Sequence, residues 1–142
     1  MKNNLIILII VVLSPFVVNG QVSNELHNTA MECWELADFS CAEIYLRDLV
    51  KLEKDSELLS DYYLKLGIIL SESGSSKEAL KMFKLALKQN PHFVDAYVKR
   101  GELYSREGNI KKARADFDEA LKLEPGCESA RNNIAQLMSE NN

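Results

Sequence analysis

The chain has 142 residues, of which 46% are apolar and 27% charged, enough for one domain or a short string of repeats around a buried core. Its 21 acidic and 17 basic residues give a net charge of −4. This balance argues against nucleic acid as the main partner, because no excess of basic side chains is left to neutralise phosphates. With only 6 Gly and 3 Pro, the composition excludes a disordered or collagen-like chain.

The first twenty residues have the pattern of a secretory signal peptide. A short positive start precedes an apolar run from Leu5 to Val18. That run is shorter than the ~20 residues that span a bilayer. Val18 and Gly20 are small residues that suit a cleavage site. We therefore predict that residues 1–20 are removed and that residues 21–142 form an exported domain, periplasmic or extracellular. The alternative is an N-terminal anchor that stays uncleaved.

The next segment predicts a helical hairpin. A first helix is expected over about Asn24 to Leu36, with Leu26, Ala30 and Cys33 facing inward. Asp38 is the expected N-cap of a second helix, because its short carboxylate can accept hydrogen bonds from the free N–H groups of the first turn.

Two of the three cysteines lie on either side of this hairpin turn. Export would place them in an oxidising compartment, where disulfides persist. Across a tight helical hairpin, Cys33 and Cys41 can approach to bonding distance, so we predict a bridge between them. The alternative is a buried Cys33 thiol with Cys41 at the surface. Cys127 is then left over, as a free thiol or as a link between chains.

A fixed sequence period runs through the second half of the chain. Identical residues recur at one and the same offset in six pairs: Gly67 and Gly101, Gly74 and Gly108, Ala79 and Ala113, Phe83 and Phe117, Ala86 and Ala120, and Pro91 and Pro125. Apolar residues between these positions recur at helical spacing. Each period therefore predicts two helices that must stack on neighbouring copies to bury their apolar faces.

The turn inside each copy has clear chemical signals. Gly74 and Gly108 follow the first helix, where the chain needs positive φ. Ser75 and Asn109 come next as N-caps of the second helix, and Ser75 with Glu78 matches a capping box.

Small and rigid residues mark the rest of each copy. We expect Gly67 and Ala79 to face each other where the two helices cross, with Phe83 beside the crossing. Pro91 and Pro125 are expected to stop the second helix and to begin the next one, since proline is tolerated in a first helical turn.

These residues resemble the tetratricopeptide repeat. One copy reads Tyr63-x2-Leu66-Gly67-x2-Leu70 and then Ala79-x3-Phe83-x2-Ala86-x4-Pro91, and Arg100 replaces the leucine in the next. The resemblance implies an all-α fold, a short right-handed solenoid of antiparallel helix pairs with a C-terminal capping helix. Its expected parts are a degenerate repeat at about 23–56, repeats at 60–93 and 94–127, and the capping helix at 128–140.

The capping helix has its own apolar pattern. We expect it to cover the open end of the stack with five side chains: Ala130, Ile134, Ala135, Leu137 and Met138.

No motif in the sequence predicts catalysis. His27 and His92 are the only histidines, and neither has a second ligand at metal-binding spacing. No nucleophile motif, phosphate loop or dinucleotide fingerprint occurs. We therefore expect neither an enzyme nor a bound metal or cofactor.

The resemblance also implies a peptide-binding groove on the concave side, lined by the first helix of each repeat. The residues projected onto that side are Met31, Trp34, Leu64, Ile68, Ser71, Val98, Glu102, Ser105 and Asn132, with His27 and Gln136 at its ends. The family's carboxylate clamp is absent, because Leu64, Val98 and Glu102 stand where its basic or amide residues would fall. An apolar groove suits an amphipathic or extended apolar partner segment. The alternative is that these side chains are core.

Together, these patterns predict an exported protein–protein interaction module that binds a partner segment in the groove, as an adaptor, assembly factor or scaffold. One alternative is a structural protein that self-assembles through an exposed end or through Cys127. A less favoured alternative is a carrier for an apolar ligand.

Overall fold

In the computed structural model of the protein, residues 15–140 are described, and within them the chain forms seven α-helices and no strand. The chain divides into two compact units, residues 1–53 and residues 54–142. The helices are α2 (Pro15–Glu35), α3 (Phe39–Leu52), α4 (Ser56–Glu72), α5 (Ser76–Gln89), α6 (Val94–Arg106), α7 (Ile110–Leu123) and α8 (Glu128–Glu140).

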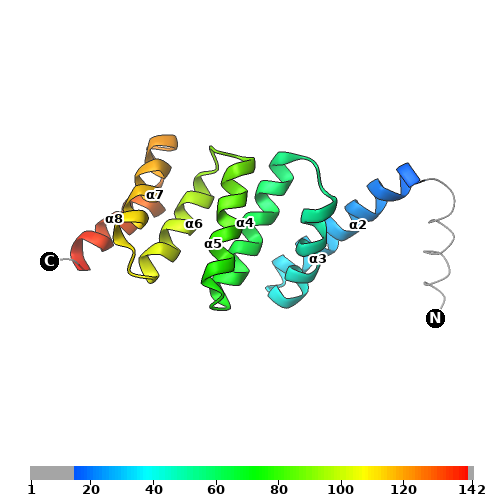
Figure 1. The fold of residues 1–142 in the computed structure, drawn as a ribbon, viewed down its shortest axis with the longest axis horizontal. Helices are drawn as coiled ribbons and strands as arrows, with labels where there is room; N and C mark the ends of the chain where they lie inside the picture. The colour runs from blue at the N-terminus through cyan, green and yellow to red at the C-terminus, as the bar shows by residue number, and fades with distance from the viewer. Residues whose placement is uncertain (1–14, 141–142) are drawn as a thin grey trace. The chain divides into compact units, whose positions relative to one another are not determined.

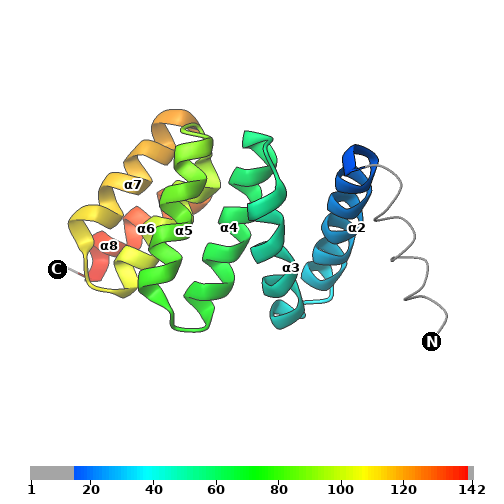
Figure 2. The ribbon, with the colours of Figure 1, turned by 45° about the vertical axis from the view of Figure 1, so that its right-hand side comes forward.

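The first unit is a hairpin of α2 and α3 (Figure 2). Ala37 makes the turn with a φ of 56°, and the Asp38 carboxylate accepts a hydrogen bond from the backbone N–H of Cys41 at 3.0 Å. Asp38 is therefore the N-cap that the sequence predicts. Cys33 and Cys41 are joined by a disulfide across this turn, with their Cα atoms 5.7 Å apart. Cys127 is free and half-buried.

The first helix is longer than the sequence predicts. The pattern places its start near Asn24, whereas α2 already includes Pro15, the first described residue. Residues 1–14, which form most of the predicted signal peptide, lie outside the described residues.

The second unit contains two stacked helical hairpins, α4 with α5 and α6 with α7 (Figure 1). Gly74 and Gly108 stand in the turns of these hairpins with φ values of 82° and 73°. Glycine adopts this left-handed backbone conformation at little energetic cost, because it has no Cβ atom. The role that the sequence predicts for these two glycines is confirmed.

A phenylalanine ring lies directly against a glycine in each hairpin. A Cβ atom added at Gly67 would lie 2.5 Å from the ring of Phe83, and one added at Gly101 would lie 2.6 Å from the ring of Phe117. The partner that the sequence predicts for Gly67 is Ala79, with Phe83 to one side. The absence of a side chain at residue 67 instead makes room for the ring itself.

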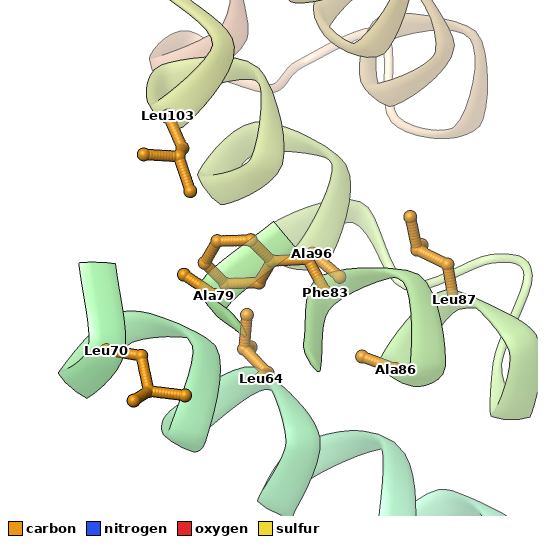
Figure 3. Close-up of a cluster of buried hydrophobic side chains, with 8 residues drawn as sticks. All are labelled: Leu64, Leu70, Ala79, Phe83, Ala86, Leu87, Ala96 and Leu103. Carbon is orange, nitrogen blue, oxygen red and sulfur yellow. The ribbon is translucent and has the colours of Figure 1, made fainter. Parts of the chain in front are cut away.

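The core of the second unit continues across the hairpins. Figure 3 shows Phe83 and Ala79 of α5 among Leu64 and Leu70 of α4 and Leu103 of α6. A second cluster joins α6 and α7 to α8. Because each hairpin buries its apolar side against the next, the second unit has the stacked architecture of a solenoid.

Two of the predicted turn details are wrong. Ser75 is the N-cap of α5, but its side chain makes no capping hydrogen bond, so the expected capping box does not form. Pro91 and Pro125 lie in the turns before α6 and α8, three residues ahead of each helix. They end the preceding helix without joining the first turn of the next.

The second unit begins with the N-cap of its first helix. Ser56 is the first residue of α4. Asp55 is the N-cap, and its carboxylate accepts hydrogen bonds from the N–H groups of Glu57 and Leu58 at 2.9 and 3.0 Å. This cap allows the helix to begin at Ser56, because it satisfies two backbone N–H donors that would otherwise have no partner within the helix.

The terminal helix α8 packs against the last hairpin. Ala130 and Leu137 are buried in the cluster that contains Phe117, and Ile134 packs against it. Ala135 and Met138 were expected on the same side but are exposed. The apolar stripe of α8 is therefore narrower than the sequence indicates.

One ion pair replaces apolar residues inside the second hairpin. The Arg100 guanidinium donates to both carboxylate oxygens of Asp116, at 2.8 and 2.7 Å, and lies 5.6 Å from the centre of the Tyr97 ring. Burial lowers the pKa of Arg100, but the hydrogen bond and charge of Asp116 outweigh that effect and raise the pKa above its ordinary value. One period earlier the same positions hold Leu66 and Met82.

We expect Gly67→Ala to destabilise the protein by about 1–3 kcal/mol, because the new methyl group would overlap the Phe83 ring. Chemical denaturation followed by circular dichroism measures this change. Gly126→Ala is the matched control, since a Cβ there meets nothing within 4 Å. Equal stability of the two variants would contradict the close approach of ring and backbone.

We expect Asp116→Met alone to destabilise the protein by about 2–3 kcal/mol, because it leaves the Arg100 charge without its partner where its side chain is only 18% exposed. The double variant Arg100→Leu/Asp116→Met copies the preceding repeat and should recover most of that loss. A double-mutant cycle in denaturant tests this. If the losses in unfolding free energy of the two single variants add up in the double variant, apolar side chains cannot replace the ion pair at this site.

Candidate functional site

Three residues predicted to line an apolar groove are instead part of the core. Leu64, Val98 and Ser71 are only 6%, 4% and 7% exposed. Leu64 packs in the cluster around Phe83, and Val98 packs in the cluster around Phe117. Leu64 and Val98 are therefore core, as the alternative interpretation of the sequence has it, and they do not form an accessible apolar lining.

The other predicted groove residues are scattered. Ile68 packs half-buried against the core, Ser105 is half-buried, and Asn132 is exposed. Met31 and Trp34 belong to the first unit, where both are half-buried and Trp34 lies against the ring of Phe39, with centroids 5.5 Å apart. Within the second unit, the predicted groove residues therefore do not form one accessible apolar surface.

The first helices of the second unit are instead connected by polar side chains. Arg106 on α6 donates hydrogen bonds to the hydroxyl of Ser71 and, at 3.4 Å, to the carboxylate of Glu72, both on α4. Half of the Arg106 side chain and 64% of that of Glu72 are exposed. This contact joins α4 and α6 at a surface that a partner can reach.

A second contact continues the row to the terminal helix. The carboxylate of Glu102 on α6 accepts hydrogen bonds from the Lys99 ammonium at 3.0 Å and from the side-chain amide of Asn133 on α8 at 3.4 Å. The two sets of contacts lie on successive turns of α6. We call them together the polar ladder, consisting of Ser71, Glu72, Lys99, Glu102, Arg106 and Asn133.

Four members of the ladder were not among the predicted site residues. Glu72 and Arg106 are separated by 34 residues, which is one full period, so they occupy the same position in successive repeats. The sequence alone shows that these equivalent positions carry opposite charges, and this pattern indicates a contact between stacked helices. Lys99 stands three residues before Glu102 on the same helix, so the sequence also contains a signal for this pair. Asn133 carries no such signal, because its contact depends on how α6 and α8 cross.

The ladder offers hydrogen bonding and balanced charge. It contains two acidic and two basic side chains, each basic group being paired with an acidic one. Such a surface can hold polar groups of a partner in a defined register. Among the described residues no cluster of three or more His, Cys, Asp or Glu side chains is suited to a metal ion. No helix in the described part of the chain is long and apolar enough to cross a membrane.

A hollow of about 490 Å³ lies between the start of α4 and the turn before α6. Its lining includes Asp55, Asp61, Leu58 and Phe93. Asp55 caps α4, and Asp61 is paired with Lys65 at 2.9 Å. These acidic groups therefore serve the local structure, and we assign no ligand to the hollow.

Solved structures share this fold. The tetratricopeptide repeat (TPR) domain of Arabidopsis OM64 is 22% identical and has a TM-score of 0.77, with 86% of this chain and 98% of that chain covered. MamA is 21% identical with a TM-score of 0.76, over 84% of this chain and 68% of that one. The first TPR domain of Spaghetti (RPAP3), bound to the HSP90 peptide SRMEEVD, is 16% identical with a TM-score of 0.75, over 84% and 93%. At these identities the similarity establishes the fold alone.

Comparison with curated protein sequences finds no significant match. Two family models match adjacent segments, residues 60–93 and residues 94–127, and both describe the tetratricopeptide repeat. These segments begin and end where the sequence period places them. With two consecutive repeats and the fold of tetratricopeptide repeat domains, this chain belongs to the tetratricopeptide repeat family.

Proposed function

We propose that the protein is an exported protein–protein interaction module, and that the face carrying the polar ladder binds a segment of a partner protein. The observation that carries this proposal is the ladder itself, which connects three helices, α4, α6 and α8, through exposed and half-buried polar side chains. Residues held by one another in this way need little further ordering when a partner binds.

The ladder favours a partner segment that is polar and close to neutral. Its two carboxylates and two cations offset each other, so a strongly acidic peptide gains no net attraction. The RPAP3 domain of similar fold was solved with the acidic peptide SRMEEVD. For this chain we propose instead an extended segment whose backbone groups bond to side chains such as Asn132 and Ser105, which lie on the same helices.

Docking of this kind involves no covalent step. The apolar residues that suggested a ligand carrier, Leu64 and Val98, are part of the core, so nothing on this face favours an apolar small molecule. The partner role supported by the ladder is that of an adaptor, assembly factor or scaffold.

The first unit supports export. Its cysteines form a disulfide, and disulfides persist mainly outside reducing compartments. The sequence of residues 1–20 has the charge, length and small residues of a cleavable signal. We propose that the mature protein begins at Gln21 and acts in the periplasm or outside the cell.

We expect Glu102→Ala/Arg106→Ala to reduce partner recovery about tenfold or more, because it removes the centre of the ladder without changing the net charge. The measurement is affinity capture from the native compartment with the tagged protein, quantified by mass spectrometry. The control is Arg114→Ala/Asp118→Ala, which removes one exposed acid–base pair from α7. Equal recovery by both variants would contradict the assignment of this face.

We expect intact mass and N-terminal sequencing of the native protein to give Gln21 as the first residue. Alkylation without reduction should modify Cys127 only, and alkylation after reduction should modify all three cysteines. An N-terminus at Met1 would establish the uncleaved anchor instead. Modification of Cys33 and Cys41 without reduction would show that the bridge is absent in the cell.

A further inference from the structure

Charge is divided unevenly between the two units. Residues 1–53 carry 7 of the 21 acidic side chains but only 3 of the 17 basic ones. Residues 54–142 carry the remaining 14 of each sign. The net negative charge of the chain therefore lies entirely in the first unit, and any basic surface lies in the second.

The basic surface is a single face of α5. Lys77, Lys81, Lys84 and Lys88 follow each other at intervals of four, three and four residues, which places them on one side of a helix. All four are exposed, and none of them has an ion pair among the described residues. The opposite side of α5, which contains Phe83, is buried in the core. We call these four residues the lysine face.

This face is not a requirement of the repeat. One period later the corresponding residues are Lys111, Ala115, Asp118 and Lys122. Asp118 there pairs with Arg114 at 3.1 Å, and Lys122 pairs with Glu119 at 2.9 Å. Of the three charged residues at these positions of α7, Asp118 and Lys122 are therefore paired locally, whereas none of the four lysines of the lysine face is.

An acidic counterpart exists on α2. Glu25, Glu32 and Glu35 are spaced by seven and three residues, so they also share one side of a helix. All three are exposed and form no ion pair with any described residue. On α3 of the same unit, by contrast, Glu43 is paired with Arg47 and Asp48 with Lys51, each at 2.8 Å. We call the three residues of α2 the glutamate face.

We propose that the lysine face of one molecule binds the glutamate face of a second copy of this chain. The two faces match in sign and in length, since the stretch from Lys77 to Lys88 extends about 16 Å along a helix and that from Glu25 to Glu35 about 15 Å. Helices laid side by side over that length can pair charges along the whole contact. The pair then retains one free face of each sign, a glutamate face on one copy and a lysine face on the other.

The contact joins two different surfaces, so it is heterologous and continues head to tail. It rests on exposed charges, which attract each other weakly and are screened by salt. The association is therefore expected to be concentration-dependent, and to be lost between about 0.05 M and about 0.5 M salt. It goes beyond the partner binding proposed for the polar ladder and does not depend on it.

Sedimentation velocity of the native protein over a range of concentrations tests this proposal. Wild type should form dimers and larger species at low salt and become monomeric at high salt. Lys81→Glu/Lys84→Glu should be monomeric throughout, because it reduces the net charge of the lysine face from +4 to zero. Glu25→Lys/Glu32→Lys should also be monomeric, because it changes the net charge of the glutamate face from −3 to +1. Mixing the two variants should restore association with an apparent Kd at least about tenfold lower than that of either variant alone.

Two further variants serve as controls. Lys111→Glu/Lys112→Glu makes the same change in net charge on α7 and should still associate like wild type. Glu102→Ala/Arg106→Ala removes the centre of the polar ladder and should also associate. Circular dichroism establishes that every variant is folded.

Three results would overturn the proposal. The first is a wild type that is monomeric at every concentration in low salt, which would leave the lysine face to an acidic partner of another kind. The second is association that salt does not weaken. The third is a mixture of the two charge-reversed variants that stays monomeric.

Discussion

The contact between a phenylalanine ring and a bare glycine backbone determines how closely the helices of each hairpin approach. Phe83 lies against Gly67, and Phe117 lies against Gly101. A large ring can enter the space between two helices only where the facing residue has no side chain. Because both hairpins use the same contact, their first helices present equivalent residues at the same height, and this alignment makes contacts between successive repeats regular.

The polar ladder is a consequence of that alignment. Glu72 and Arg106 occupy the same repeat position, so stacking the repeats brings opposite charges together without any special turn or loop. Glu102 then extends the connection to α8 through Asn133. The face has polar chemistry because the apolar side chains beneath it, Leu64 and Val98, are used by the core.

The same repeat tolerates different chemistry inside its core. Leu66 and Met82 in one copy correspond to Arg100 and Asp116 in the next. The ion pair satisfies its own hydrogen bonds and also lies near the Tyr97 ring, so the fold accepts charge where its neighbour uses apolar side chains. Local pairing of this kind accounts for most charges of α7, and the lysine face of α5 differs because it lacks such partners.

The sequence by itself determined the helical pairs, the turn glycines and the family. Each of these follows from short-range rules: helical spacing, positive φ at Gly74 and Gly108, and a fixed period that repeats one structural unit. The helical pattern does not predict the part of α2 that precedes Asn24, because helix ends depend on residues beyond the apolar repeat.

Only the tertiary structure decided which side chains of the first helices remain accessible. Position along a helix predicts a face, but stacking decides how much of that face the next helix covers. Leu64 and Val98 therefore became core, while Arg106 and Glu102, one or two turns further along α6 than Val98, became the accessible row. Burial depends on neighbours distant in the chain, and that information is not contained in any one helix.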